Sequence, residues 1–136
     1  MNTKKCNKCE KTLPVTEFYS DITKKDKLHT ICKGCKKERR DYLKTVIAEY
    51  YDLFGGCVVC GYNKCSAAID FHHIHSEHKE VAISKMSTSS EKRIREEIFK
   101  TIPLCKNCHM EYHHDVGETK DFFIKKHEEC AKGWNL

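Results

Sequence analysis

Residues 105–114 read CKNCHMEYHH and combine two metal-ligand spacings in one short stretch. Cys105 and Cys108 are separated by two residues, which is the spacing of half a tetrahedral zinc site. His109 and His113 stand four apart, so on a helix both imidazoles project from one face and can share a metal ion. The stretch therefore predicts a pair of structural zinc ligands followed directly by two ligands of another ion.

Three more C-x-x-C pairs precede this stretch, which gives enough cysteines for two Cys₄ zinc sites. We expect the first two pairs to form one site and the last two to form the other: Cys6, Cys9, Cys32 and Cys35, then Cys57, Cys60, Cys105 and Cys108. Redox pairs or chance spacing are the alternatives, but four pairs in one chain favour zinc. Cys65 and Cys130 fall outside the pairs and are expected to be half-buried.

The composition is that of a globular protein, with 136 residues of which 39% are hydrophobic and 33% are charged. No apolar run approaches the roughly 20 residues that span a bilayer. The N-terminus also has no apolar signal-peptide core. We therefore expect an intracellular protein with no membrane partner, in which cysteines stay reduced and a disulfide framework is disfavoured.

Positive charge is concentrated in the first part of the chain. Residues 1–54 carry 13 Lys and Arg against 8 Asp and Glu, whereas residues 55–136 carry 12 of each kind. This asymmetry fits contact with a polyanion, although a solvated lysine-rich face explains it as well.

Residues 1–35 form a unit with 22 residues between its two cysteine pairs. Such a loop offers a small core, including Phe18, Tyr19, Ile22 and Ile31, so a metal must supply much of its folding free energy. Its sequence, KCNKCEKTLPVTEFYS followed by KKDKLHTICKGCKKE, resembles the small zinc ribbon at the front of many phage-encoded nucleases and other phage proteins. That resemblance implies an accessory role in contacting nucleic acid.

Helical spacing of apolar residues predicts an amphipathic linker helix over residues 36–54, stopped by Gly55 and Gly56. Its basic residues are candidate DNA contacts, or equally a solubilising face: Lys36, Lys37, Arg39 and Arg40.

Further along, residues 67–74 read as a strand that ends in His72 and His73. Two more helices are expected, over residues 91–100 with Ser90 as N-cap and Pro103 ending it, and over residues 118–131. A zinc ion held by the last two cysteine pairs would bring the strand with His72 and His73 beside the helix with His109 and His113.

This combination of C-x-x-C, DFHHI and LCKNCHMEYHH resembles an HNH endonuclease of the ββα-metal superfamily over about residues 57–114. The resemblance implies a small, zinc-stabilised α+β protein. Its parts would be a Cys₄ zinc ribbon (1–35), the amphipathic linker helix (36–54) and a ββα-metal nuclease domain with a C-terminal helix (55–136). A phage-encoded protein of this kind would act in the host cytoplasm.

By the same resemblance, His72, His109 and His113 hold one catalytic divalent ion in addition to two structural zinc ions. We expect Mg²⁺ or Mn²⁺ there, with other divalent ions left open. His73 is the general base, and cleavage of DNA leaves 5′-phosphate and 3′-hydroxyl ends. Asp70 and Glu111 could orient the histidines. Lys100 stands where the family has its middle Asn, and it would either approach a phosphate or be solvated.

Three functions stay open at this point. The first is a DNA endonuclease or nickase, and the second is a zinc-dependent DNA-binding or assembly protein that does not cleave, which the Lys100 departure favours. The third is a structure-selective nuclease acting on branched DNA. The remaining histidines are expected to be surface residues: His29, His75, His78, His114 and His127.

Overall fold

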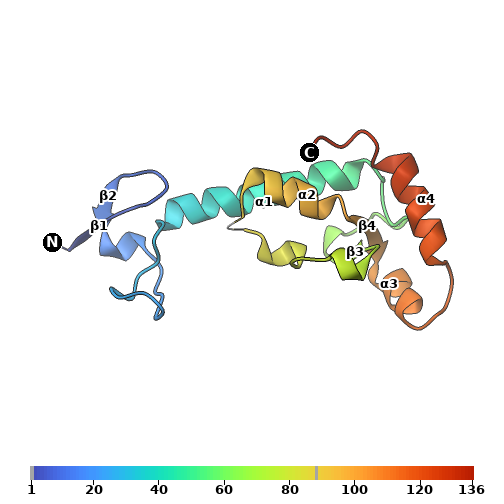
Figure 1. The fold of residues 1–136 in the computed structure, drawn as a ribbon, viewed down its shortest axis with the longest axis horizontal. Coiled ribbons are helices and arrows are strands. Elements are labelled where there is room, and N and C mark those ends of the chain that lie inside the picture. Colours follow the sequence, from blue (N-terminus) through green and yellow to red (C-terminus); the bar gives the residue numbers. More distant parts are fainter. Residues whose placement is uncertain (1, 88) are drawn as a thin grey trace. The chain divides into compact units, whose positions relative to one another are not determined.

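The computed structural model describes residues 2–87 and 89–136 and has an α+β fold with two small sheets. The chain divides into two compact units, Met1–Leu43 and Lys44–Leu136 (Figure 1). Within the described residues, no helix is both long enough and apolar enough to cross a membrane.

The first unit opens with a two-stranded antiparallel hairpin, β1 (Thr3–Lys5) and β2 (Thr12–Pro14). The turn between the strands carries the first C-x-x-C pair, and it is closed by a bond from the Cys6 amide to the Lys11 carbonyl at 2.9 Å. A short 3₁₀ helix, η1 (Val15–Glu17), follows β2. The hairpin thus presents the first cysteine pair on a hydrogen-bonded turn.

The apolar core of this unit is smaller than the sequence indicates. Phe18 and Ile31 are buried with three of the cysteines, but Tyr19 is 40% exposed and Ile22 is 89% exposed, so their assignment to the core was wrong. Asp21 accepts a hydrogen bond from the Thr23 amide at 3.0 Å, which folds this segment into a local turn with Ile22 at its tip. The cysteine cluster is therefore the centre of the unit.

Helix α1 (Lys33–Asp52) begins directly after Cys32, three residues earlier than expected. In the second unit its Val46 and Tyr50 side chains are fully buried, and the Tyr50 hydroxyl donates to the Thr101 carbonyl at 2.6 Å. The helix ends before Gly55 and Gly56. Gly56 has φ of 143°, and a Cβ there would lie 2.9 Å from the Gly61 carbonyl oxygen, so only glycine fits.

The second unit is built on an antiparallel pair, β3 (Ile69–His73) and β4 (Thr101–Cys105), in which Ile69 faces Cys105 and His73 faces Thr101. Helix α3 (Lys106–His113) starts at the end of β4 and packs against both strands. Helix α2 (Glu91–Ile98) precedes β4, and Ser90 caps it by accepting from the Arg93 amide. Short 3₁₀ helices complete the connections: η2 (Ser66–Ala68), η3 (Ser76–His78) and η4 (Ile83–Lys85).

Strand β4 was not predicted, and Pro103 does not end a helix but lies inside this strand. Helix α2 ends earlier, at Ile98, whose carbonyl accepts a bond from the Thr101 hydroxyl at 2.7 Å. The Pro103 carbonyl accepts from the Val58 amide, on the side of β4 away from β3. The amide hydrogen that proline lacks would point the same way, so its absence costs the β3–β4 ladder nothing.

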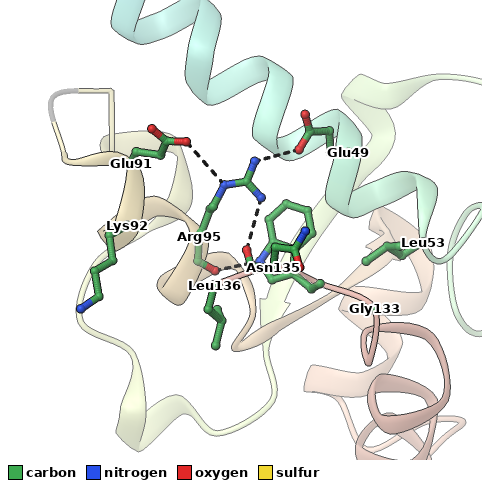
Figure 2. Close-up of a pocket in the computed structure, with 9 residues that line it drawn as sticks. Glu49, Leu53, Glu91, Lys92, Arg95, Gly133, Asn135 and Leu136 are labelled. Atoms are coloured by element: carbon green, nitrogen blue, oxygen red, sulfur yellow. Dashed lines mark hydrogen bonds and ion pairs between the residues drawn. The ribbon is translucent and has the colours of Figure 1, made fainter.

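The C-terminal segment is fixed to the rest of the second unit through Trp134 and through Arg95, whose contacts Figure 2 shows. Helix α4 (Lys120–Cys130) buries Phe123 in the core. The Trp134 indole donates to the Arg95 carbonyl at 3.1 Å and packs edge-on against Tyr50. The Arg95 guanidinium in turn pairs with Glu49 at 3.0 Å, so the tail ties α2 to the second half of α1.

Candidate metal centres

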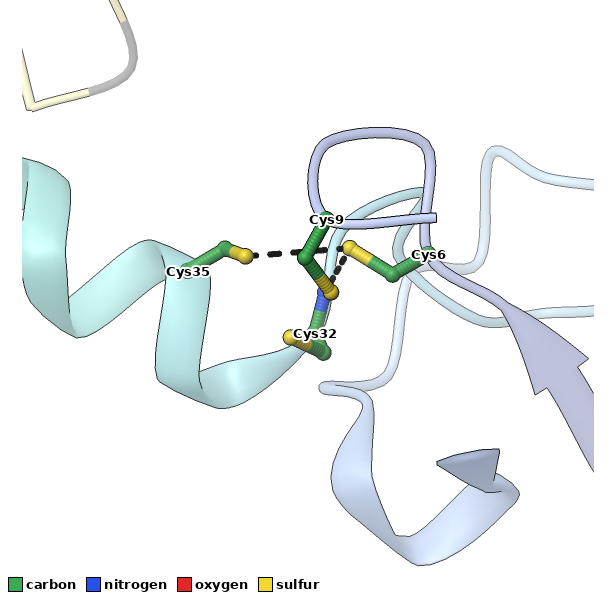
Figure 3. Close-up of side chains that lie close together, drawn as sticks. All are labelled: Cys6, Cys9, Cys32 and Cys35. Atoms are coloured by element: carbon green, nitrogen blue, oxygen red, sulfur yellow. Dashed lines mark hydrogen bonds between the residues drawn. The ribbon is translucent and has the colours of Figure 1, made fainter. Parts of the chain in front are cut away.

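The first unit brings its four paired cysteines together at the start of α1 (Figure 3). Their sulfur atoms all lie within 4.8 Å of one another, and the Cys6 and Cys35 sulfurs are 3.9 Å apart. Thiolates bound tetrahedrally at about 2.3 Å from a zinc ion lie about 3.8 Å apart. Cys6, Cys9, Cys32 and Cys35 are thus geometrically suited to zinc.

Backbone amides already favour negative charge on one of these sulfurs. The amides of Cys32 and Lys8 donate to Cys6 Sγ at 3.3 and 3.4 Å. Burial raises the pKa of the Cys6 thiol, but the hydrogen bonds outweigh this and lower the pKa to about 6. Burial and the neighbouring thiols raise the pKa of Cys35 to about 12. A divalent cation is what would let all four ionise together.

The second unit gathers the other four paired cysteines in the same way. The Cys60 and Cys105 sulfurs are 3.7 Å apart, and the Cys108 amide in the first turn of α3 donates to Cys105 Sγ at 3.4 Å. Gly61 follows Cys60 with φ of 76°, which is the left-handed conformation that the turn requires. Cys57, Cys60, Cys105 and Cys108 also suit zinc, and four thiolates leave no coordination position for chemistry.

A third cluster, made of His72, His109 and His113, lies where β3 meets α3. The Nδ1 atom of His72 is 3.2 Å from His109 Nε2, and His113 Nε2 is 3.0 Å from the same atom. Ligands at about 2.1 Å from one ion are separated by about 3.0 to 3.4 Å in octahedral or tetrahedral geometry. His72 and His113 thus each lie at the spacing of a fellow ligand from His109, and all three nitrogens lie within 4.8 Å of one another.

The surroundings of this cluster also fit a cation. His109 Nδ1 is 3.1 Å from Asp70 Oδ2, so Nδ1 carries the hydrogen and Nε2 turns its lone pair toward the other two rings. Burial, followed by the nearby His109 and His113 rings, lowers the pKa of His72 to about 4, which keeps this ring neutral. The His72 Nε2 atom is buried without a hydrogen-bond partner among the described residues. A lone pair on His109 Nε2 therefore faces the ring nitrogens of His72 and His113.

The donor set bears on which ion would be held. Imidazole nitrogens suit Zn²⁺, Ni²⁺, Cu²⁺ and iron, whereas Mg²⁺ prefers carboxylate, carbonyl and water oxygens. The cluster offers three imidazoles, and its nearest carboxylate, Asp70, is turned to a ring nitrogen and to the Lys106 ammonium. A transition-metal ion therefore fits this site better than Mg²⁺.

Asp70 is the residue that orients His109, while Glu111 is exposed. We expect Asp70→Ala to weaken Ni²⁺ binding at the histidine cluster by about 10- to 100-fold, because a ligand that loses its carboxylate partner is no longer held in its tautomer. Titration calorimetry on the zinc-loaded protein measures this. Lys106→Ala is the matched control, since it removes the other partner of Asp70 at 2.8 Å. Equal Ni²⁺ affinity in the two variants would contradict the assignment.

His73 lies outside the histidine cluster. Neighbouring residues on a strand point to opposite faces, so His72 faces α3 and His73 faces α2. His73 is 7% exposed, and its Nε2 is 2.9 Å from Glu97 Oε1. Burial lowers the pKa of His73, although the Glu97 hydrogen bond opposes this, so the ring is neutral at neutral pH.

Glu97 was not predicted to take part in the site. It is the partner that accounts for the position of the Lys100 side chain. The Lys100 ammonium bonds to Glu97 Oε2 at 2.7 Å and to the His78 carbonyl at 3.1 Å. The sequence signal for this ion pair is the spacing of the two residues, since Glu97 and Lys100 stand three apart at the end of a predicted helix. Nothing in the sequence indicated that this pair would face His73.

The four basic residues proposed to contact DNA lie in the first turns of α1, within the first unit. Lys37 pairs with Asp41 at 2.8 Å, the Lys36 ammonium lies 5.4 Å from the centre of the Tyr19 ring, and Arg40 is exposed.

Of the expected surface histidines, His29 instead has its Nδ1 buried without a partner in the described part of the chain. His127 bonds the Phe99 carbonyl. Cys65 is exposed rather than half-buried.

The comparisons with known proteins do not identify a family for this chain. Protein-family models, curated proteins and solved structures were searched, and none matches the chain.

Proposed function

We propose that this protein is a metal-dependent DNA endonuclease or nickase of the HNH type. The observation that carries the proposal is the approach of His72 and His113 to His109 Nε2 at 3.2 and 3.0 Å, on a strand pair and the helix that follows it. His73 stands next to His72 on the same strand. This arrangement agrees with the resemblance of residues 57–114 to that superfamily.

In the proposed reaction, a water molecule gives a proton to the neutral His73 ring while its oxygen forms a bond to phosphorus. The bond from phosphorus to the 3′ oxygen breaks, and that oxygen takes a proton from solvent, which leaves 5′-phosphate and 3′-hydroxyl ends. A divalent ion held by the three histidines would supply positive charge beside the phosphate and the leaving oxygen.

The first unit would supply affinity for DNA. Lys36, Lys37, Arg39 and Arg40 lie close together on α1, and phosphate contacts of this kind hold a protein on DNA without reading sequence. Lys100 is not assigned a phosphate, because its ammonium already bonds to Glu97 and His78.

A DNA-binding or assembly protein that does not cleave is the second candidate. It is favoured by the burial of His73, since a ring that is 7% exposed and bonded to Glu97 gives little access to an attacking water. In that case the histidine cluster would be a third structural metal site.

The two candidates differ in the result of a cleavage experiment. Supercoiled and branched DNA are incubated with the zinc-loaded protein and Mg²⁺, Mn²⁺ or Ni²⁺, beside the His73→Ala variant. We expect the wild type to nick or cut, and the variant to be slower by about 100-fold or more, because a general base contributes that much. His78→Ala is the control, since His78 is exposed. Binding without cleavage under every condition would replace the nuclease by the binding protein, and a marked preference for branched DNA would identify a structure-selective nuclease.

A further inference from the structure

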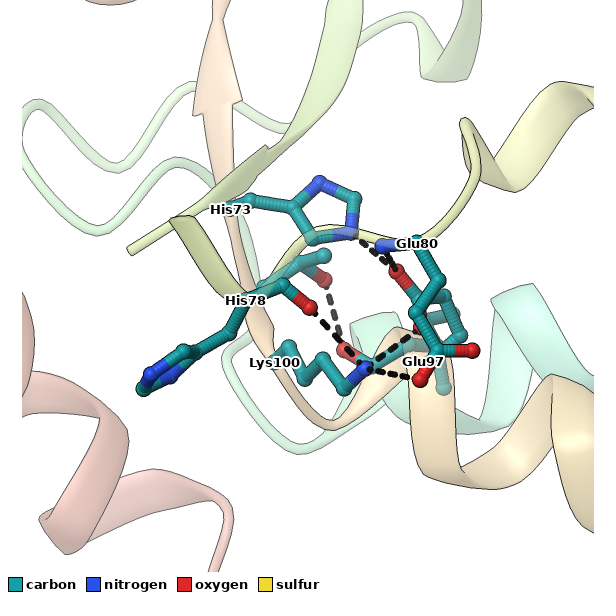
Figure 4. Close-up of polar contacts among 7 residues, drawn as sticks. His73, His78, Glu80, Glu97 and Lys100 are labelled. Carbon is teal, nitrogen blue, oxygen red and sulfur yellow. Dashed lines mark hydrogen bonds and ion pairs between the residues drawn. The ribbon is translucent and has the colours of Figure 1, made fainter. Parts of the chain in front are cut away.

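Glu97 is a buried carboxylate with every oxygen engaged (Figure 4). It lies on α2, is 2% exposed, and accepts from the Glu80 amide at 3.1 Å and from His73 Nε2 at 2.9 Å through Oε1. Its Oε2 accepts from the Lys100 ammonium at 2.7 Å. Burying an isolated carboxylate is costly, so these hydrogen bonds are what offset the burial of Glu97.

The network keeps Glu97 ionised. Burial raises the pKa of Glu97, but the hydrogen bonds from Lys100, the Glu80 amide and His73 outweigh this and hold the pKa below its usual value. The hydrogen bond to Glu97 in turn raises the pKa of Lys100. An ionised carboxylate only accepts hydrogen bonds, so the Nε2 atom of His73 must carry the hydrogen. The lone pair of the neutral ring is therefore on Nδ1.

The free edge of β3 is where both faces of the strand can be reached. No third strand pairs with β3 in the ranges that the structure describes, and a pocket of about 470 Å³ runs along it. His73 and Asp70 both line this pocket, together with Lys79. Asp70 is the partner of His109, so one residue that lines this pocket also contacts the histidine cluster.

We propose that Glu97 is the positioning residue of His73, holding Nδ1 as the proton acceptor at the edge of β3, and that Lys100 holds Glu97 in place. The inference rests on the proposed function. It gives Lys100 a role at the position where the HNH pattern has Asn: the ion pair with Glu97 supports the general base from the opposite side. A buried ion pair that serves stability alone is the alternative.

Two measurements test this assignment on the zinc-loaded chain of 136 residues. The first is the tautomer of His73, read from ¹⁵N NMR shifts of the ring, with the His73→Gln variant identifying its signals. We expect hydrogen on Nε2 in the wild type and loss of that preference in Glu97→Gln. Hydrogen on Nδ1 in the wild type would overturn the proposal.

The second measurement is steady-state cleavage. Glu97→Gln is expected to lower kcat by about 100-fold while KM changes by less than about threefold, because the base is misplaced but DNA contacts remain. Glu96→Gln is the matched control, since Glu96 is exposed and pairs with Lys92. Wild-type kcat in Glu97→Gln would contradict a positioning role. If Glu97→Gln does not fold, Lys100→Met takes its place, with a decrease of about 10-fold expected.

The NMR result separates the two proposals. A wild type that never cleaves DNA would remove the endonuclease proposal, while the tautomer would still show whether Glu97 fixes the His73 ring.

Discussion

Replacing Cys57 with serine is expected to unfold the second unit and to reduce tightly held zinc from two ions to one per chain. Cys57 is 4% exposed and belongs to the same apolar cluster as Ile69, Ile102 and Leu104. A structural zinc site contributes about 10–16 kcal/mol in small peptides, and a whole domain is stable by only about 5–15 kcal/mol. If the loss of one ligand releases the zinc ion, it therefore removes an amount comparable to the entire stability of the unit.

Zinc content after dialysis and thermal melting followed by circular dichroism measure this effect. Cys65→Ser is the matched control, because Cys65 is exposed and belongs to neither Cys₄ cluster. We expect it to keep two zinc ions and the wild-type melting temperature. Two tightly held ions in Cys57→Ser would contradict a role for the second cluster as a structural zinc site.

The grouping of the eight paired cysteines could be predicted because C-x-x-C spacing is local and zinc has a fixed ligand number. The same applies to His109 and His113, since the helical period alone places residues four apart on one face. The strand ending in His72 and His73 was also recognisable from its apolar run, and the structure has it as β3.

Strand β4 and the partner of His73 could not be predicted because both depend on tertiary contacts. Pro103 suggests a break in isolation, and only the bond of its carbonyl to Val58 shows that its missing amide hydrogen is not needed by β3. Glu97 looked like one of several surface acids on a charged helix, and its burial follows from where α2 packs. Ile22 was wrongly placed in a core for the converse reason, since a hydrogen-bonded turn holds it outside.

His109→Ala is expected to have the largest effect on the histidine cluster. Its Nε2 is the atom that both His72 and His113 approach, and its Nδ1 is held by Asp70. Removing this ring takes away one of the three ligands, and it is the ligand that both other rings contact. Affinity for Ni²⁺ should therefore fall by more than the roughly 10- to 100-fold that the loss of a supporting carboxylate costs, and DNA cleavage should fall to below about one hundredth of wild type.

His114→Ala is the control that makes this result specific. His114 directly follows His113, is exposed, and lies outside the group of three histidines, so its loss should leave Ni²⁺ affinity and cleavage unchanged. Both variants should retain two zinc ions, because the cysteine ligands are untouched. If His114→Ala were the variant that lost Ni²⁺ binding, His114 and not His109 would be the ligand, and the site would have to be assigned to other residues. If neither variant lost it, the ion would bind elsewhere, and the three nitrogens at 3.0 to 3.2 Å would be a packing arrangement and not a metal site.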